Sequence, residues 1–163
     1  MSEDGQRVLD LLLDVDPENR CDSDAALGTD SPKKVGKSWK INRDLVAREL
    51  AENIPSVQPG NVSGNTRLDG VKTINGVECL TVTSNIQVED IAPQLPPGIK
   101  VKSATLTLTL GGAFPVNPSL YLMEKDENSK FEMIAKGKTT DGQPAEAHDT
   151  VVVATKKEFT PKK

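Results

Sequence analysis

Hydrophobic and polar residues alternate along the middle of the chain. In residues 100–110 every second side chain is apolar, and the positions between them carry hydroxyl groups. The two sets are Ala104, Leu106, Leu108, Leu110 and Ser103, Thr105, Thr107, Thr109. Period two is typical of a strand with one dry and one wet face, as found in antiparallel sheets. Residues 77–88 repeat the pattern, with Leu80, Val82, Ile86 and Val88 on one face and Cys79, Thr81, Thr83, Asn85 and Gln87 on the other.

Turn residues divide this pattern into strands. Asn75-Gly76 predicts a two-residue hairpin between residues 66–74 and 77–88, because both residues tolerate the positive φ of a type I′ turn. Asp126–Ser129 predicts a second hairpin between residues 120–125 and 130–136. We expect breaks at residues 93–98 and at Gly111-Gly112 with the prolines that follow. We also expect a polar loop over residues 137–147 and a last strand over residues 150–155.

One helix is expected, over residues 43–54. Asn42 or Asp44 can cap it, and Val46, Leu50 and Ile54 form one apolar stripe. Pro55 ends it, because a proline disfavours the helical conformation in the residue before it. Residues 6–15 also have apolar residues at helical spacing, but the run is short, and a buried strand fits it nearly as well.

These elements predict an α+β fold, namely a curved, half-barrel-like antiparallel sheet of six or seven strands with one short helix packed on its apolar face. Three regions are expected along the chain. Residues 1–34 form an acidic N-terminal segment that is partly ordered, residues 35–156 form the antiparallel β domain with helix 43–54, and residues 157–163 form a basic tail.

Composition and charge exclude some partners. The 163 residues carry a net charge of −4, and residues 1–30 hold nine acidic side chains against Arg7 and Arg20. A nucleic-acid surface usually shows a basic stripe over the whole domain, so we expect no nucleic-acid partner. No apolar run approaches the roughly 18 residues that span a bilayer, so the chain is not expected to cross a membrane.

The acid–base residues give little support for catalysis. His148 is the single histidine, and it stands beside Glu146 and Asp149 in a Pro/Ala-rich stretch. One imidazole falls short of the three or four protein ligands that zinc takes, and an exposed loop histidine is the simpler interpretation. Familiar nucleophile and phosphate-loop motifs are also missing from the sequence. We therefore predict a non-enzymatic protein, with no catalytic, cofactor-binding or metal-binding residues.

An acidic stretch partly resembles a calcium loop. Asp14, Asp16, Glu18 and Asp22 stand at suitable offsets, but Asn19 replaces the expected glycine. Ala25 replaces the bidentate glutamate at the last position. A solvated acidic loop accounts for the stretch better than a cation site. The hydroxyl face of residues 103–109 is likewise read as an ordinary outward sheet face rather than a recognition surface for sugar or ice.

Two further residue types leave alternatives open. Cys21 and Cys79 permit one disulfide in an oxidising compartment, and equally two free thiols. Trp39 is the only tryptophan, and period two places it with Val35 and Ile41. Because only 3% of the residues in the chain are aromatic, we expect Trp39 to be largely buried as an anchor and not to contact a ligand. Gly36 is expected to mark the start of a strand or a close backbone approach.

Four short motifs carry a resemblance to a known class of proteins. They are K-V-G-K-S-W-K-I, V-x-G-N-x-x-L, I-N-G-V-E-C-L-T-V-T and G-x-F-P-V-N-P, which together span residues 34–118. This stretch resembles an uncharacterised family of bacterial secreted and lipoprotein domains with a V-G-x-S-W motif, which are similar to lipoprotein-carrier half-barrels. The resemblance implies an extracytoplasmic location, in the periplasm or cell envelope, although this chain shows no leader. It implies no activity.

The leading hypothesis is an extracytoplasmic binding or structural domain that holds a hydrophobic ligand such as a lipid. Leu106, Leu108, Leu110, Leu80 and Val82 are expected to line the concave side of the sheet, with the helix beside them. The alternative is a protein–protein interaction module of the cell envelope that uses a sheet edge or the acidic N-terminal segment. An enzyme of unknown reaction is the third hypothesis.

Overall fold

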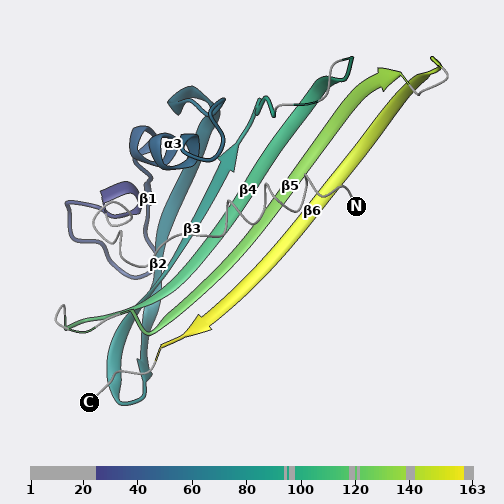
Figure 1. Ribbon diagram of the computed structural model, residues 1–163. Coiled ribbons are helices and arrows are strands. Elements are labelled where there is room, and N and C mark those ends of the chain that lie inside the picture. The colour runs from purple at the N-terminus through teal and green to yellow at the C-terminus, as the bar shows by residue number, and fades with distance from the viewer. Residues whose placement is uncertain are drawn as a thin grey trace.

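A single antiparallel sheet dominates the computed structural model, which describes residues 25–93, 95, 98–117, 120, 122–138 and 142–159 (Figure 1). The elements run β1 (Ser38–Lys40), α3 (Arg43–Ala51), the short 3-10 helix η1 (Pro59–Asn61), β2 (Val62–Ile74), β3 (Val77–Val88), β4 (Lys100–Pro115), β5 (Glu124–Lys138) and β6 (Pro144–Glu158). Each strand pairs with the next one along the chain, in the order β1-β2-β3-β4-β5-β6.

The predicted fold class is confirmed. Six antiparallel strands form one curved sheet that does not close, and α3 with the residues around it lies against one side (Figure 1). We call this side the helix face; it carries Leu106, Leu108 and Ile86. The opposite side, the polar face, carries Thr107 and Thr109, as the alternation predicts.

The main core lies between the helix face and the segments that cover it. Val46 and Ala47 of α3 are buried there together with apolar residues from β2, β3, β4 and β5. Ala26 is also buried in this core, so the short helical turn at residues 25–27 packs with the sheet. None of the helices in the described part of the chain is long and apolar enough to cross a membrane.

The predicted helix and first hairpin are both present. Asn42 caps α3 by accepting a hydrogen bond from the backbone N–H of Leu45. The helix ends at Ala51, three residues before the predicted end, yet Ile54 is still buried in the core. Asn75 and Gly76 have φ values of 49° and 79°, which fit the type I′ turn.

Gly111-Gly112 does not interrupt β4, contrary to the prediction. The strand continues to Pro115, and Gly111 pairs with Thr83 on one side and Asp126 on the other. Pairing with both neighbouring strands holds these two residues extended, so the backbone conformational freedom of glycine does not break the strand. Pro115 is tolerated because it is the last residue of β4.

The second predicted hairpin is also wrong. Asp126–Ser129 lies inside β5, which runs unbroken from Glu124 to Lys138. These four polar residues pair with β4 and with β6, so the ladders on both sides outweigh their preference for turns. Two of them, Glu127 and Ser129, are buried on the helix face.

The predicted polar loop over residues 137–147 is much shorter in the structure. β5 extends to Lys138 and β6 begins at Pro144, and Gly142 takes a φ of 84° between them. The last strand therefore covers Pro144–Glu158 and not residues 150–155 alone. All 15 residues of β6 pair with β5 without a register shift.

Candidate functional site

An apolar strip lies on the helix face at the end of the sheet near the Asn75-Gly76 turn. Val71, Leu80 and Phe114 stand side by side across β2, β3 and β4. Val82 and Leu110 continue the strip toward the core. Val71 is 51% exposed and Phe114 is 41% exposed, so this end of the face is open to solvent.

Gly112 makes room for the aromatic ring of this strip. A Cβ atom at Gly112 would lie 2.5 Å from Cε2 of Phe114 and 3.0 Å from its Cζ. The ring of Phe114 therefore lies over the backbone of Gly112, where any other residue would displace it. Gly112 pairs with Val82, so the ring extends the apolar surface toward the core end of β3.

Two lysines border the apolar strip on the same face. Lys125 pairs with Gly112 across β4 and β5, and Lys157 pairs with Lys125 across β5 and β6. Like charges directly opposite each other in a sheet are destabilising. Glu127 compensates in part, because its carboxylate lies 3.1 Å from Nζ of Lys125. The strip thus ends in a local excess of positive charge.

The residues expected to line a concave ligand site divide into two groups. Leu106 and Leu108 are buried in the core beside Val46 of α3, so no ligand reaches them. Leu80, Val82 and Leu110 are only partly buried and belong to the apolar strip. The accessible apolar surface therefore lies nearer the Asn75-Gly76 turn than predicted.

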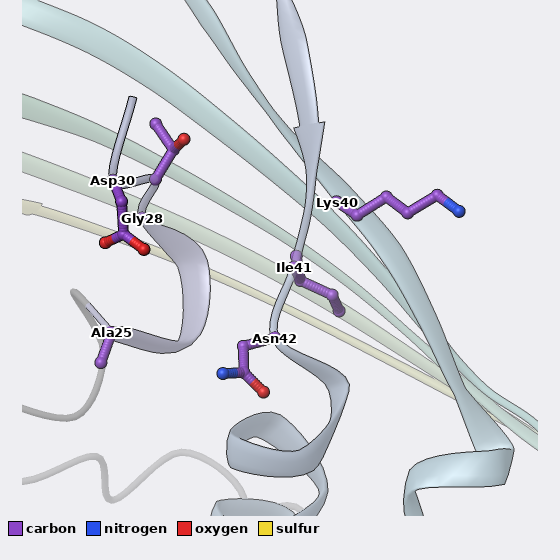
Figure 2. Close-up of a pocket in the computed structure, with 7 residues that line it drawn as sticks. Ala25, Gly28, Asp30, Lys40, Ile41 and Asn42 are labelled. Carbon is purple, nitrogen blue, oxygen red and sulfur yellow. The ribbon is translucent and has the colours of Figure 1, made fainter. Parts of the chain in front are cut away.

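The hollow next to the start of α3 holds about 340 Å³ and is lined mainly by polar groups. It lies between the loop that carries Gly28 and Asp30 and the residues that precede α3 (Figure 2). Lys40 points away from Asp30 in this view, so the two charged groups do not converge on one ligand (Figure 2).

A second hollow of about 420 Å³ lies between the β2 end of the Asn75-Gly76 turn and the residues around Met123. Lys72 donates a hydrogen bond to Glu124 here, and the two form an ion pair. Cys79 lies nearby on the polar face, fully buried in a small cluster with Ala113 and Met123. Burial raises the pKa of the Cys79 thiol, which makes it a poor nucleophile at neutral pH.

The acid–base residues near His148 do not form one constellation. His148 lies in β6 and not in the predicted loop, although it is exposed as expected. Its Nε2 is 3.1 Å from Oε1 of Glu146, and both side chains project from the polar face. Asp149 is the next residue of the strand and projects from the other face. The described residues contain no group of three or more acidic, histidine or cysteine side chains that could hold a metal ion.

Trp39 acts as a structural anchor. Its indole Nε1 donates a 2.8 Å hydrogen bond to the backbone carbonyl of Leu27, which ties the segment before β1 to the sheet. Trp39 is half-buried, whereas we expected it to be largely buried. Val35 does not share its face as predicted, because Val35 and Gly36 form a turn and Gly36 has a φ of 82°.

Two hydroxyl groups of the polar face donate hydrogen bonds to polar side chains of the neighbouring strand. Thr109 donates to Oδ1 of Asn85, and Thr83 donates to Oδ2 of Asp69. These two hydrogen bonds occupy two of the hydroxyl groups that a regular recognition surface would offer to a ligand.

Several predictions fall on residues outside the described ranges. They concern the helix or strand at residues 6–15, the acidic loop with Asp14, Asp16, Glu18, Asn19 and Asp22, and Cys21. Cys79 is a free cysteine, so no disulfide in the described part of the chain indicates a compartment.

The pair of Lys125 and Lys157, which we call the lysine pair, is not predicted from the sequence. The prediction of a turn at Asp126–Ser129 concealed the register that places Lys125 opposite Lys157.

Comparison with protein-family models, with curated proteins and with solved structures finds no match for this chain.

Proposed function

We propose that the chain is a non-catalytic binding domain that takes an anionic amphiphile, such as a fatty acid, on the helix face. The acyl chain lies along the apolar strip of Val71, Leu80, Val82, Leu110 and Phe114. The carboxylate group lies near Lys125 and Lys157. An extracytoplasmic location is part of this proposal, supported by the resemblance of the V-G-K-S-W segment to secreted and lipoprotein domains.

The proposal rests mainly on one observation, namely that Lys125 lies opposite Lys157 at the border of an exposed apolar strip. An anionic head group between these two lysines relieves their repulsion, while the chain removes Val71 and Phe114 from water. Both effects favour the same orientation of the ligand. A neutral apolar ligand gains only the second effect.

The first test is the binding of cis-parinaric acid, a fluorescent fatty acid, and its displacement by palmitate. Val71→Ser and Phe114→Ser each remove part of the apolar strip. We expect each to weaken binding by up to about tenfold, because full burial of such a side chain contributes about 1.5–3 kcal/mol and the ligand covers only the exposed half of it. Val152→Ser is the matched control, since Val152 is an exposed valine on the polar face.

The second test separates the head group from the chain. Lys157→Gln should weaken the displacement by palmitate but leave the displacement by 1-hexadecanol, which has no charge, unchanged. Two results would overturn the proposal. One is no displacement by palmitate up to its solubility limit, and the other is an equal loss of affinity in the Val152→Ser control.

A further inference from the structure

The two edges of the sheet differ greatly. β1 at one edge has 3 residues, whereas β6 at the other has 15. Among the residues that the structure describes, β6 pairs only with β5. Natural sheets protect their edges with short strands, bulges, prolines or inward charges. Register shifts occur within β2 and β4 but not in β6, so this edge is long and regular.

The centre of β6 carries residues that favour strand pairing. Positions 150–155 (TVVVAT) are uncharged and mostly β-branched. Val152 is 64% exposed, the highest value among the large hydrophobic side chains that the structure describes. Charged residues occupy both ends of the strand. This pattern suits a second strand that runs antiparallel beside it.

From this edge we infer that β6 pairs antiparallel with β6 of a second copy of this chain, which forms one continuous sheet of two copies. In the register that pairs the whole strand, Pro144 lies opposite Glu158 and Val151 lies opposite its own copy at the two-fold axis. The inference rests on the open edge of β6 and does not need the proposed ligand, whose acyl chain lies on the helix face at β2–β4 and whose head group lies near Lys125 and Lys157.

Charge complementarity selects this register. It places Glu146 opposite Lys156 of the second copy, and the two-fold symmetry makes this pair twice. Within one chain Glu146 lies opposite Lys136 and forms an ion pair with it, while Lys156 lies opposite Asp126. The row across the interface therefore reads Lys136, Glu146, Lys156, Asp126, with charges that alternate in sign. Opposite charges at facing positions stabilise a sheet.

Neighbouring registers are less favourable. A shift by two residues in one direction places Glu146 opposite Glu158, which is repulsive. A shift by two in the other direction places Glu146 opposite Ala154 and loses the ion pair. A shift by four pairs Asp149 with Lys157 but leaves residues 144–147 without a partner strand.

Sedimentation equilibrium on the full chain without ligand tests the inference. The average mass should rise from 17.5 kDa toward twice that value as the concentration increases. Glu146→Lys and Lys156→Glu each create like-charge pairs across the interface, and each should weaken dimerisation by about tenfold. The double variant restores opposite charges and should recover most of the loss. Glu132→Lys, a charge reversal on β5, is the matched control.

Amide hydrogen exchange provides a second readout. At high concentration, protection should appear at alternate residues of β6, since every second N–H points away from β5. A mass that stays at 17.5 kDa up to millimolar concentration overturns the inference. Species larger than a dimer also overturn it, because they indicate open-ended pairing with another edge. If the single and double charge variants have equal dimer dissociation constants, the register that places Glu146 opposite Lys156 is wrong.

Discussion

The hydroxyl oxygens of Thr66 and Ser84 lie 2.9 Å apart in the buried part of the helix face. The two residues are directly opposite each other in β2 and β3, between apolar neighbours. Each hydroxyl group therefore has a hydrogen-bond partner where no water reaches it, and the pair places matched polar groups inside the core in the observed register.

Removal of one member of this pair should cost more than removal of both. Ser84→Ala leaves the Thr66 hydroxyl without a partner, and should lower the free energy of unfolding by about 1–3 kcal/mol. Thr66→Val with Ser84→Ala removes both polar groups and should cost less than the sum of the single changes. Denaturant unfolding measures the coupling. A coupling energy of zero would contradict this account, and Thr107→Val, at an exposed position of the polar face, is the control.

Gly64 is expected to tolerate no side chain. A Cβ at this position would lie 2.4 Å from the backbone oxygen of Asn85 and 2.9 Å from Cδ1 of Ile41. The carbonyl belongs to the adjacent strand and cannot rotate away, so Gly64→Ala should destabilise the protein by about 1–3 kcal/mol. Gly60→Ala is the matched control, because nothing lies within 4 Å of its added Cβ. Thermal unfolding gives the midpoint temperature of each variant, and equal midpoints for Gly64→Ala and Gly60→Ala would refute the prediction.

Cys79 should be unreactive in the folded protein. It is fully buried, and burial raises its pKa, so the reactive thiolate is scarce at neutral pH. In a Cys21→Ser background, a thiol reagent such as DTNB should label Cys79 only when denaturant unfolds the chain. Met123→Ala opens the small cluster around the thiol and should accelerate labelling. Rapid labelling of the folded Cys21→Ser protein would show that the thiol is accessible.

The carboxyl group of Glu146 should titrate below its ordinary range. The hydrogen bond from Lys136 is the main reason that its pKa is lowered. Its folded pKa lies below its unfolded pKa, so the pairing stabilises the fold above the ordinary glutamate pKa. That contribution is lost as the pH falls through the lowered value.

Carboxyl-carbon NMR titration in dilute solution measures this shift. Lys136→Gln should raise the pKa of Glu146 toward its ordinary value. Lys130→Gln removes a comparable exposed lysine that pairs with Glu132 and should leave the Glu146 titration unchanged. An identical Glu146 titration in the wild type and in Lys136→Gln would contradict the assignment.

Alternation and one strong turn motif predicted much of the fold. Residues 100–110 and 77–88 have the faces expected of them, and Asn75-Gly76 forms the expected turn. These features are local, because side-chain period and positive φ depend on a few neighbouring residues. The cap at Asn42 is predictable for the same reason, since its side chain bonds only three residues ahead.

The two wrongly predicted strand breaks share one physical cause. Gly111-Gly112 and Asp126–Ser129 prefer turns in isolation, yet each is paired on both sides in the sheet. Those ladders depend on strands distant in the sequence, so the local signal is misleading. The lysine pair at the apolar strip was missed for the same reason, because its register is visible only when β5 is recognised as one long strand.

The order of the strands bears on how the protein folds. Every strand of the meander pairs with its neighbour in the chain, so most of the sheet closes through short loops. Such a sheet can grow one hairpin at a time as the ribosome extends the chain. β6 leaves the ribosome last of the six strands. Until it docks, β5 is the outermost strand and exposes the buried polar residues Glu127 and Ser129 at the growing edge.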